Sequence, residues 1–506
     1  MHFLRSKPRF ASCSATRNDA AAHLEKKELV RNRRSQAMFV VTVVVVMLAA
    51  ACGRSSSNTA ATTGGAPSPS TAAPASPGSF GDLKGVCGPA PSGAKLAASD
   101  TGVTATSIQV SAFSDPGYSG RPGLDQELFD SADAFTKWCN NAGGISGRKI
   151  ILKKRDAKVL EFQQRVIEAC DQHDFMMVGG GAVFDNTGQT NRLACGLPTV
   201  AGFTVNASAS AADLTYEAVP NPTNKLSIGQ LRYLNDHFPA ATKKIGVLAG
   251  SVPVTISVAN RDKEALKDLG WKVVYNAQYN SVGEPTWRPY AEAIKNAGVK
   301  GLIWVGDPGI LASVMKALSD IGYKLDFVSA DPNHYDSLLL TNGGSSVDGT
   351  YIRGVFYPFL DEAEAKKNPA TEQYRAIVKQ YVPKGKIAYL GVQGFSAWLL
   401  WAQAATACGA DVTRDCVWQQ LSHVTTWTGG GLHAPQNVAA HAPGDCYSLE
   451  QVRNGKFVLT DINANQGIYR CDPSSVVSLK GNYGQGEKCP NPKYATDPKP
   501  SNCAKP

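Results

Sequence analysis

The sequence lacks the short motifs that mark the common enzyme classes. It contains no G-x-S-x-G, H-E-x-x-H or G-x-x-x-x-G-K-[ST] pattern, the spacings that place a serine nucleophile, a zinc ion or a nucleotide phosphate. Gly179-Gly180-Gly181 is followed by Ala182-Val183-Phe184, so a dinucleotide loop would lack its third glycine. The eight histidines are scattered without metal-ligand spacing. We therefore expect no enzyme, no catalytic residue, no cofactor and no metal site.

A large excess of charge of one sign is also missing from most of the chain. The sequence has 51 basic and 42 acidic residues, a net charge of +9. Residues 1–51 hold nine Lys or Arg and three Asp or Glu, which leaves 42 basic and 39 acidic residues, or +3, in the remainder. The basic residues are dispersed, with no stripe interleaved with aromatic residues. Nucleic acid is therefore not an expected partner.

Long hydrophobic runs are absent except for one near the N-terminus. The apolar run from Met38 to Ala51 is shorter than the roughly 20 residues of a membrane-spanning helix. Three arginines precede it and small residues end it, the pattern of a secretory signal. Leu48-Ala49-Ala50-Ala51-Cys52 resembles the lipobox of bacterial lipoproteins, which implies a signal peptide over residues 30–51 and a lipid anchor on Cys52. The alternative is a buried apolar strand that ends at a free cysteine.

The segments on either side of this signal carry little that can fold. Residues 1–29 show no clear period, so they are expected to be a lead or to be untranslated, with Val30 as the start. Arg54 to Ser79 consists almost entirely of Ser, Thr, Ala, Gly and Pro and cannot offset its ordering entropy. Residues 52–84 are therefore predicted to be a disordered tether. Together with the secretory signal and the lipid anchor on Cys52, this tether would place the protein on the extracytoplasmic face of the cell membrane.

Cysteine usage agrees with export. Of 12 cysteines, ten remain without Cys13 and Cys52, and an even set in an exported chain indicates disulfides. Local spacing favours two pairs, Cys170 with Cys195 and Cys408 with Cys416. Cys489 with Cys503 would hold the C-terminal tail, and elimination leaves Cys446 with Cys471 and Cys87 with Cys139. For each pair the alternative is reduced, buried cysteines.

From residue 104 on, strand and helix patterns alternate, and the alternation starts again near residue 224. Helical spacing of apolar residues marks 125–141 and 160–171, and short apolar runs between them mark strands. We predict a further helix over Asn224–His237 and a hairpin around Asn454-Gly455. Strands separated by helices imply right-handed crossovers and parallel sheets. The fold class is therefore α/β, with two doubly wound units.

One stretch carries a family resemblance. Trp138 to Ile150 (WCNNAGGISGRKI) is similar to the helix–turn–strand signature of type I periplasmic binding proteins, in the branched-chain amino acid (Leu/Ile/Val) receptor family. Phe175 to Gly180 and Cys195 to Val200 resemble later parts of the same family in the same order. The resemblance covers roughly residues 104–469, and the tether and the cysteine-rich tail are similar to those of actinobacterial members.

The resemblance implies an architecture and a mechanism. Lobe one would comprise residues 104–218 plus 357–422, and lobe two residues 221–352 plus 432–469, followed by a Cys/Pro-rich tail over 470–506. Two doubly wound lobes joined by three hinge crossings would close over a small polar solute at the strand carboxyl ends. The closed form, a monomer, would deliver the solute to the permease of an ABC importer in the membrane. The alternative is a ligand-sensing regulatory module on the same fold, without transport.

Family position also implies the ligand contacts. These are Tyr118 after the first strand, Asp185, Asn186 and Thr187 after the third, Gly202, Phe203 and Thr204 after the fourth, and Asp307 and Asp331 in lobe two. Asp185 departs from the family pattern, because it would repel the carboxylate of an amino acid. Asp307 precedes Pro308 and could instead cap a helix. Asp331 stands where the family places the acid that pairs with a ligand ammonium. Amino acids, amides and other small polar solutes all stay open as ligands.

Overall fold

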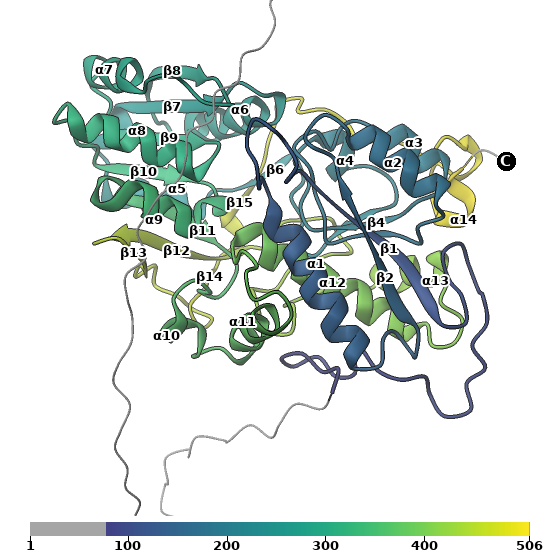
Figure 1. Ribbon diagram of the computed structural model, residues 1–506. Helices are drawn as coiled ribbons and strands as arrows, with labels where there is room; N and C mark the ends of the chain where they lie inside the picture. Colours follow the sequence, from purple (N-terminus) through teal and green to yellow (C-terminus); the bar gives the residue numbers. More distant parts are fainter. Residues whose placement is uncertain (1–76, 505–506) are drawn as a thin grey trace, which may run out of the picture. The chain divides into compact units, whose positions relative to one another are not determined.

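A computed structural model describes residues 77–504 of the chain, which form two α/β lobes (Figure 1). Each lobe is built on its own sheet. The predicted lead, the signal peptide, Cys52 and the tether up to residue 76 lie outside the described residues. Within residues 77–504, every helix is too short or too polar to cross a membrane.

Lobe one contains a five-stranded parallel sheet in the order β2-β1-β3-β4-β5. Its strands are β1 (Ser107–Ser114), β2 (Lys149–Asp156), β3 (Met177–Val178), β4 (Thr199–Ala201) and β5 (Thr215–Glu217). β1 and β2 pair over their whole length, whereas β3, β4 and β5 pair over only two or three residues. Because the strands are parallel, the loops that follow them all start at one edge of the sheet.

Helices cover both faces of this sheet. Buried residues of α1 recur at helical spacing (Leu128, Ala132, Phe135 and Cys139), and α12 is buried along nearly its whole length. These two helices pack on one face, and α2 packs on the other. The helices of the lobe are α1 (Gln126–Asn141), α2 (Phe162–Asp171), α3 (Gln189–Ala194), α4 (Ala207–Ser210), α10 (Glu362–Ala365), α11 (Pro369–Tyr381), α12 (Tyr389–Ala407), α13 (Arg414–Leu421) and α14 (Pro500–Cys503).

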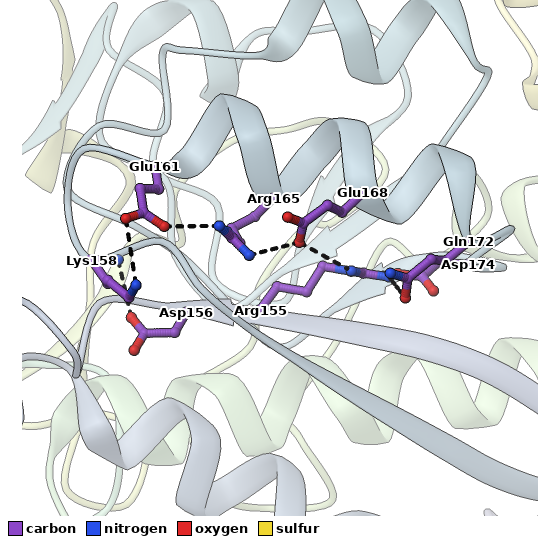
Figure 2. Close-up of polar contacts among 8 residues, drawn as sticks. All are labelled: Arg155, Asp156, Lys158, Glu161, Arg165, Glu168, Gln172 and Asp174. Atoms are coloured by element: carbon purple, nitrogen blue, oxygen red, sulfur yellow. Dashed lines mark hydrogen bonds and ion pairs between the residues drawn. The ribbon is translucent and has the colours of Figure 1, made fainter.

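An ion-pair network fixes α2 to the end of β2 (Figure 2). Arg155 Nε donates to Asp174 Oδ2 at 2.7 Å, and both side chains are buried. Glu168 Oε2 lies 3.9 Å from Arg155 Nη1 and 2.8 Å from Arg165 Nη1, and Arg165 continues to Glu161. The network sets the position of the loop between β2 and α2.

Lobe two contains an eight-stranded sheet in the order β13-β12-β11-β10-β9-β7-β8, with β14 paired to β12. The strands are β7 (Ile245–Gly250), β8 (Val273–Tyr279), β9 (Gly301–Val305), β10 (Phe327–Ala330), β11 (Thr350–Gly354), β12 (Cys446–Arg453), β13 (Lys456–Leu459) and β14 (Arg470–Cys471). β7 to β11 are parallel, and β12 is antiparallel to β11. The parallel core strands are buried on both faces, as their continuous apolar sequences require.

The helices of lobe two are α5 (Gly229–His237), α6 (Pro253–Asp268), α7 (Arg288–Asn296), α8 (Pro308–Asp320) and α9 (Ser337–Gly343). α5 and α6 share one apolar cluster with the sheet, and α7, α8 and α9 contribute to the cluster on the other face. Short 3₁₀ turns lie at Ala241–Lys243, Pro332–His334, Gly344–Val347, Pro473–Ser475 and Pro492–Tyr494.

The chain passes between the lobes after β5, after β11 and after α13. The second and third crossings pair with each other: Tyr357 N donates to Leu432 O at 2.9 Å, and Ala434 N donates to Val355 O at 2.8 Å. Two adjacent extended segments therefore form the centre of the hinge.

Two boundary predictions are wrong. The tether does not extend to residue 84, because Phe80 is fully buried with its ring centroid 5.3 Å from that of Phe395, and Phe80 supplies the apolar surface that the preceding residues lack. The helix predicted over Asn224–His237 begins at Gly229, because residues before it form the strand β6 (Lys225–Ser227). Its partner, β15 (Val476–Ser478), lies far along the chain, so local sequence gives no signal for it.

Five disulfides join the same pairs that were named from the sequence. They are Cys87–Cys139, Cys170–Cys195, Cys408–Cys416, Cys446–Cys471 and Cys489–Cys503. Cys503 is fully buried beside Leu193 of α3. The last disulfide therefore fastens the end of the chain to lobe one.

The C-terminal tail is a fourth connection between the lobes. After β15, Glu264 of α6 accepts hydrogen bonds from Gly481 N at 3.0 Å and from the Tyr483 hydroxyl at 2.6 Å. A few residues later, Asp213 of lobe one accepts from Cys489 N at 2.9 Å. The tail is thus hydrogen-bonded to both lobes, which neither its composition nor the family resemblance predicted.

We expect Glu264→Ala to free the start of the tail. The variant removes the acceptor for the Lys480 and Gly481 amides, so hydrogen exchange over residues 479–487 should become about tenfold faster. Hydrogen–deuterium exchange mass spectrometry measures it. Glu292→Ala, on an exposed lobe-two helix, is the matched control and should leave the tail unchanged; equal exchange in all three proteins would contradict the tail contact.

Candidate functional site

A buried carboxylate ties together the loops after β1, β2 and β3. Asp115 follows β1, is fully buried, and accepts from Val159 N at 2.6 Å and Val183 N at 2.8 Å. Burial raises the pKa of Asp115, and its two backbone hydrogen bonds oppose that rise. Sequence reasoning missed this residue, although an acid directly after an apolar strand is a recognisable signal.

Asp185 performs the same task one loop further on. It is 3% exposed and accepts from Val205 N at 2.8 Å and from the amide of Asn206. Burial raises the pKa of Asp185 to about 7. Its oxygens therefore join the loop after β3 to the loop after β4, which accounts for an acid where the family uses neutral donors.

Thr204 and the first crossing are held by a third buried acid. The Thr204 hydroxyl donates to Glu217 Oε1 at 2.9 Å, and Asn221 N donates to Glu217 Oε2 at 3.1 Å. Asn221 also donates from its side chain to Thr204 O at 3.0 Å. The single hydroxyl hydrogen of Thr204 is therefore used in the hydrogen bond to Glu217 beside the first crossing.

The remaining lobe-one candidates lie on the same edge. Phe203 covers Gly181, where an added Cβ would lie 2.4 Å from its ring. A cavity of about 30 Å³ beside Asp185, Phe203 and Thr204 has room for roughly one water molecule. Gly202 packs on the loop after β3, and the Thr187 hydroxyl donates within its own loop, to Phe184 O at 2.9 Å. Of the two other candidates, Asn186 is exposed and Tyr118 is half-buried. Asn186 and Tyr118 therefore keep the side chains most available to a solute.

Asp307 both caps a helix and reaches the other lobe. Its carboxylate accepts from Gly309 N at 2.8 Å and Ile310 N at 3.0 Å at the start of α8. It also forms an ion pair with Arg121, which lies after β1 in lobe one. Burial lowers the pKa of Arg121, and neighbouring acids oppose that change.

A second ion-pair bridge crosses between the lobes at Lys386. Its Nζ lies 2.8 Å from Asp336 of lobe two and 3.1 Å from Glu127 of α1. Asp125 lies nearby, and burial raises its pKa to about 8, with the charge of Glu127 adding to the effect. Sequence reasoning missed Arg121, Lys386, Asp336 and Glu127, because single-sequence patterns do not show which charges two lobes bring together.

Asp331 lies among arginines. Burial raises the pKa of Asp331 to about 6, and the charges of Arg261 and Arg353 oppose the rise. Arg261 is 3% exposed, and its Nε and Nη1 have no hydrogen-bond partner within residues 77–504. The same two guanidinium groups act on Asp262, whose pKa is raised to about 8 by burial and by the charge of Asp331, so two carboxylates share two positive charges where the resemblance placed the partner of a ligand ammonium.

Comparison with known proteins identifies the architecture. The model of the family "Periplasmic binding protein" matches residues 121–456. The chain belongs to the periplasmic binding protein family. The resemblance to the type I, Leu/Ile/Val-binding branch is confirmed by relatives such as "Leu/Ile/Val-binding protein homolog 1" of Brucella abortus (strain 2308), 27% identical over 191 residues. That match covers 36% of this chain and 46% of the relative, so the chain matches about half the length of this relative.

Solved structures share the fold. A branched-chain amino acid ABC transporter protein from Thermus thermophilus with bound valine has a TM-score of 0.61 at 15% identity, covering 73% of this chain and 98% of that one. A fatty acid ABC transporter substrate-binding protein from Thermomonospora curvata has a TM-score of 0.59, also at 15% identity, covering 75% and 98%. The structure of this periplasmic binding protein thus has the two-lobed fold.

The hinge of this binding protein contains a neutral hydrogen-bonded chain. The Ser396 hydroxyl lies 2.8 Å from His433 Nε2 and accepts from Trp427 Nε1 at 3.0 Å. His433 Nδ1 lies 2.8 Å from Ala434 O, so Nδ1 carries the proton and Nε2 accepts from Ser396. Burial lowers the pKa of His433 to about 4. The buried pair joins Ser396 of α12 to His433, which follows the third crossing, which makes it a structural contact.

We expect Asp185→Asn to loosen the ligand-facing loops. The new NH₂ group would meet backbone N–H donors in a buried place, so the free energy of unfolding should fall by about 1–3 kcal/mol. Chemical denaturation measures the change. Asp171→Asn, at an exposed position in the same lobe, should alter stability little, and equal stability of the two variants would contradict the role of Asp185.

His433 predicts a specific acid sensitivity. Unfolded histidine binds a proton near pH 6.5, whereas folded His433 does so only near its pKa of about 4. Stability from neutral His433 is therefore complete above pH 6.5 and is lost as the pH falls from 6.5 to 4. Over that range, wild type should lose about 2–3 kcal/mol more than His433→Gln, measured by urea unfolding. His423→Gln, at an exposed position, should follow wild type; parallel pH curves for all three would contradict the assignment.

Proposed function

We propose that this protein is an extracytoplasmic solute-binding lipoprotein that delivers a small polar solute to an ABC importer by closure of its two lobes. Membership of the periplasmic binding protein family supports the general role. The pair of ion bridges between the lobes, Arg121 with Asp307 and Lys386 with Asp336, is the observation that carries the proposal.

These bridges support closure because of where they lie. Arg121 follows β1, and Lys386 lies in the α11–α12 loop and contacts Glu127 at the start of α1, which also follows β1. Each pairs with an acid at the start of a lobe-two helix, beside the edge at which open α/β sheets bind ligands. The two cations are about one-third exposed, whereas Asp307 and Asp336 are 17% and 4% exposed, so the cations already contact water and the acids would regain it when the lobes open. Contacts of this kind suit two lobes that must close and open repeatedly.

The edge favours a polar solute over a purely aliphatic one. It carries Arg121 and Lys386 together with Asp125, Glu127 and Asp336, whereas the hydroxyl of Thr204 is already used by Glu217. A solute with its own hydrogen-bonding or charged groups, such as an amino acid or an amide, can replace these contacts. Valine and a fatty acid, which are named for the structural neighbours, stay alternatives as the solute of this protein.

The membrane anchor is part of the proposal. The support is the sequence alone, where the short apolar run ends directly at Cys52 and a polar segment follows. Acyl chains on Cys52 would hold the folded lobes near the permease, and firm attachment takes two signals or chains. Mass spectrometry of the N-terminal peptide from the membrane fraction tests this part; an unmodified Cys52 thiol would contradict it.

A thermal-shift panel of amino acids, amides and small metabolites tests the solute-binding function. A solute at 100 times its dissociation constant should raise the free energy of unfolding by about 2.7 kcal/mol. Arg121→Ala should weaken binding of that solute about tenfold, because it removes one side of a closure contact. Arg288→Ala, exposed on α7 and paired with Glu292 of the same helix, is the control. No stabilising solute, or equal affinity in both variants, would contradict the proposal.

A further inference from the structure

Adjacent residues of the C-terminal tail contact different lobes. The Tyr483 hydroxyl donates to Glu264 Oε2 of α6, in lobe two, at 2.6 Å. At the next residue, Gly484, an added Cβ would lie 3.0 Å from the Cβ of Ala207, the first residue of α4 in lobe one. In Figure 1 the tail, in yellow, continues from beside α6 to α14. Consecutive Cα atoms are 3.8 Å apart, so the tail has no slack where it passes from one lobe to the other.

On the lobe-one side, the tail backbone packs directly on the chain that follows β4. An added Cβ on Gly486 would clash with the carbonyl oxygen of Ala211, so only glycine allows this approach. Asp213 N donates to Glu487 O at 2.9 Å, and the Thr190 hydroxyl donates to Glu487 Oε1 at 3.0 Å. Contacts to both the main chain and the side chain of Glu487 therefore hold the tail on lobe one.

A disulfide closes the lobe-one attachment. Cys489 is 8% exposed, and its partner Cys503 is fully buried beside Leu193. Further on, Ser501 N donates to Asp415 of α13 at 2.9 Å. Because this end is buried and closed by a covalent bond, its release would expose apolar surface and break several contacts at once.

The lobe-two attachment next to the passage depends on one side chain. Glu264 accepts from the Lys480 and Gly481 amides as well as from Tyr483. Lys480 and Gly481 are exposed, and Glu264 and Tyr483 are half-buried. Hydrogen bonds at such positions exchange with water at a small net cost. This attachment is therefore the easier of the two to release.

We propose that residues 480–487 form a latch on lobe opening, with Glu264 as its releasable contact and the disulfide-closed end as its fixed contact. α4 follows β4 and α6 follows β7, so both helices begin at the carboxyl edge of their sheets. Separation of these helices opens the ligand-facing edges. Because the tail has no slack, that separation must break the contacts with Glu264 or those with lobe one, and the contacts with Glu264 are fewer and more exposed.

The latch can close again after each release. β15 keeps the start of the segment paired with β6, and the disulfide keeps its other end on lobe one. Rebinding to Glu264 is therefore intramolecular, at a high effective concentration. The latch favours the arrangement seen in the structure and makes opening less frequent. Its effect on solute entry and release rests on the proposed function, whereas the restraint itself needs no solute.

Distances between spin labels on the two lobes test the latch in the purified full chain, with its disulfides intact and without solute. The labels are attached through unnatural amino acids at Gln164 of α2 and Lys316 of α8, which are both exposed. Pulsed electron paramagnetic resonance then gives the populations of short and long separations.

Two variants release the latch in different ways. Glu264→Ala removes its acceptor, and insertion of Gly-Ser-Gly-Ser between Gly484 and Gln485 adds up to roughly 14 Å of slack while both attachments remain. We expect each to raise the ratio of long to short separations about tenfold. Two controls should keep the wild-type distribution: Glu292→Ala, and the same insertion between Pro285 and Thr286, which are exposed in lobe two.

Hydrogen exchange of residues 479–483 separates the two routes. The insertion should open the lobes while these residues stay protected, whereas Glu264→Ala should open the lobes and remove the protection. Wild-type distance distributions in both test variants, or equal opening in the control insertion, would overturn the inference. The measurement uses no solute, so its failure is distinct from the absence of a stabilising compound in the solute panel.

Discussion

Buried carboxylates that accept backbone hydrogen bonds set the shape of the ligand-facing edge of lobe one. Asp115 directly follows β1, Asp185 lies in the loop after β3, and Glu217 ends β5; all three are almost inaccessible to solvent. Asp115 accepts hydrogen bonds from the loops after β2 and β3, Asp185 from the loop after β4, and Glu217 from the loop after β4 and from the first crossing. Because a buried carboxylate without donors is costly, these acids hold the loops in one arrangement. The loops that follow four strands are thereby preorganised relative to one another.

The hinge and the facing edges of the lobes use opposite kinds of polar contact. The hinge contains backbone pairing and the neutral Ser396–His433–Trp427 chain, all buried. The edges meet through Arg121 and Lys386, which keep partial access to water. Breaking a buried neutral hydrogen bond leaves polar groups unpaired away from water, whereas the cations of the edge pairs already contact water and can separate from their acids as these become hydrated. This distribution of contacts suits a molecule in which the hinge segments stay paired while the facing edges of the two lobes move apart on opening.

The C-terminal tail adds a constraint that the two-lobed fold does not require by itself. It pairs as β15 with β6 beside the first crossing, binds Glu264 in lobe two, and ends in a disulfide on lobe one. Opening of the lobes must therefore either stretch the tail or release one of its attachments.

The sequence alone determined the α/β class, the two repeated units and the family, because apolar periodicity and glycine-rich turns are local signals. Local spacing also favoured Cys170–Cys195 and Cys408–Cys416, whereas the structure decided the pairing of the other six cysteines. It also placed Asp307 at a helix start, since an acid before a proline is a local cap. The tertiary structure decided what sequence could not show: that Asp185 and Thr204 bind neighbouring loops, that Arg121 and Lys386 bridge two lobes, and that β6 pairs with β15. Those contacts join residues far apart in the chain, and only packing brings their charges and hydrogen-bonding groups together.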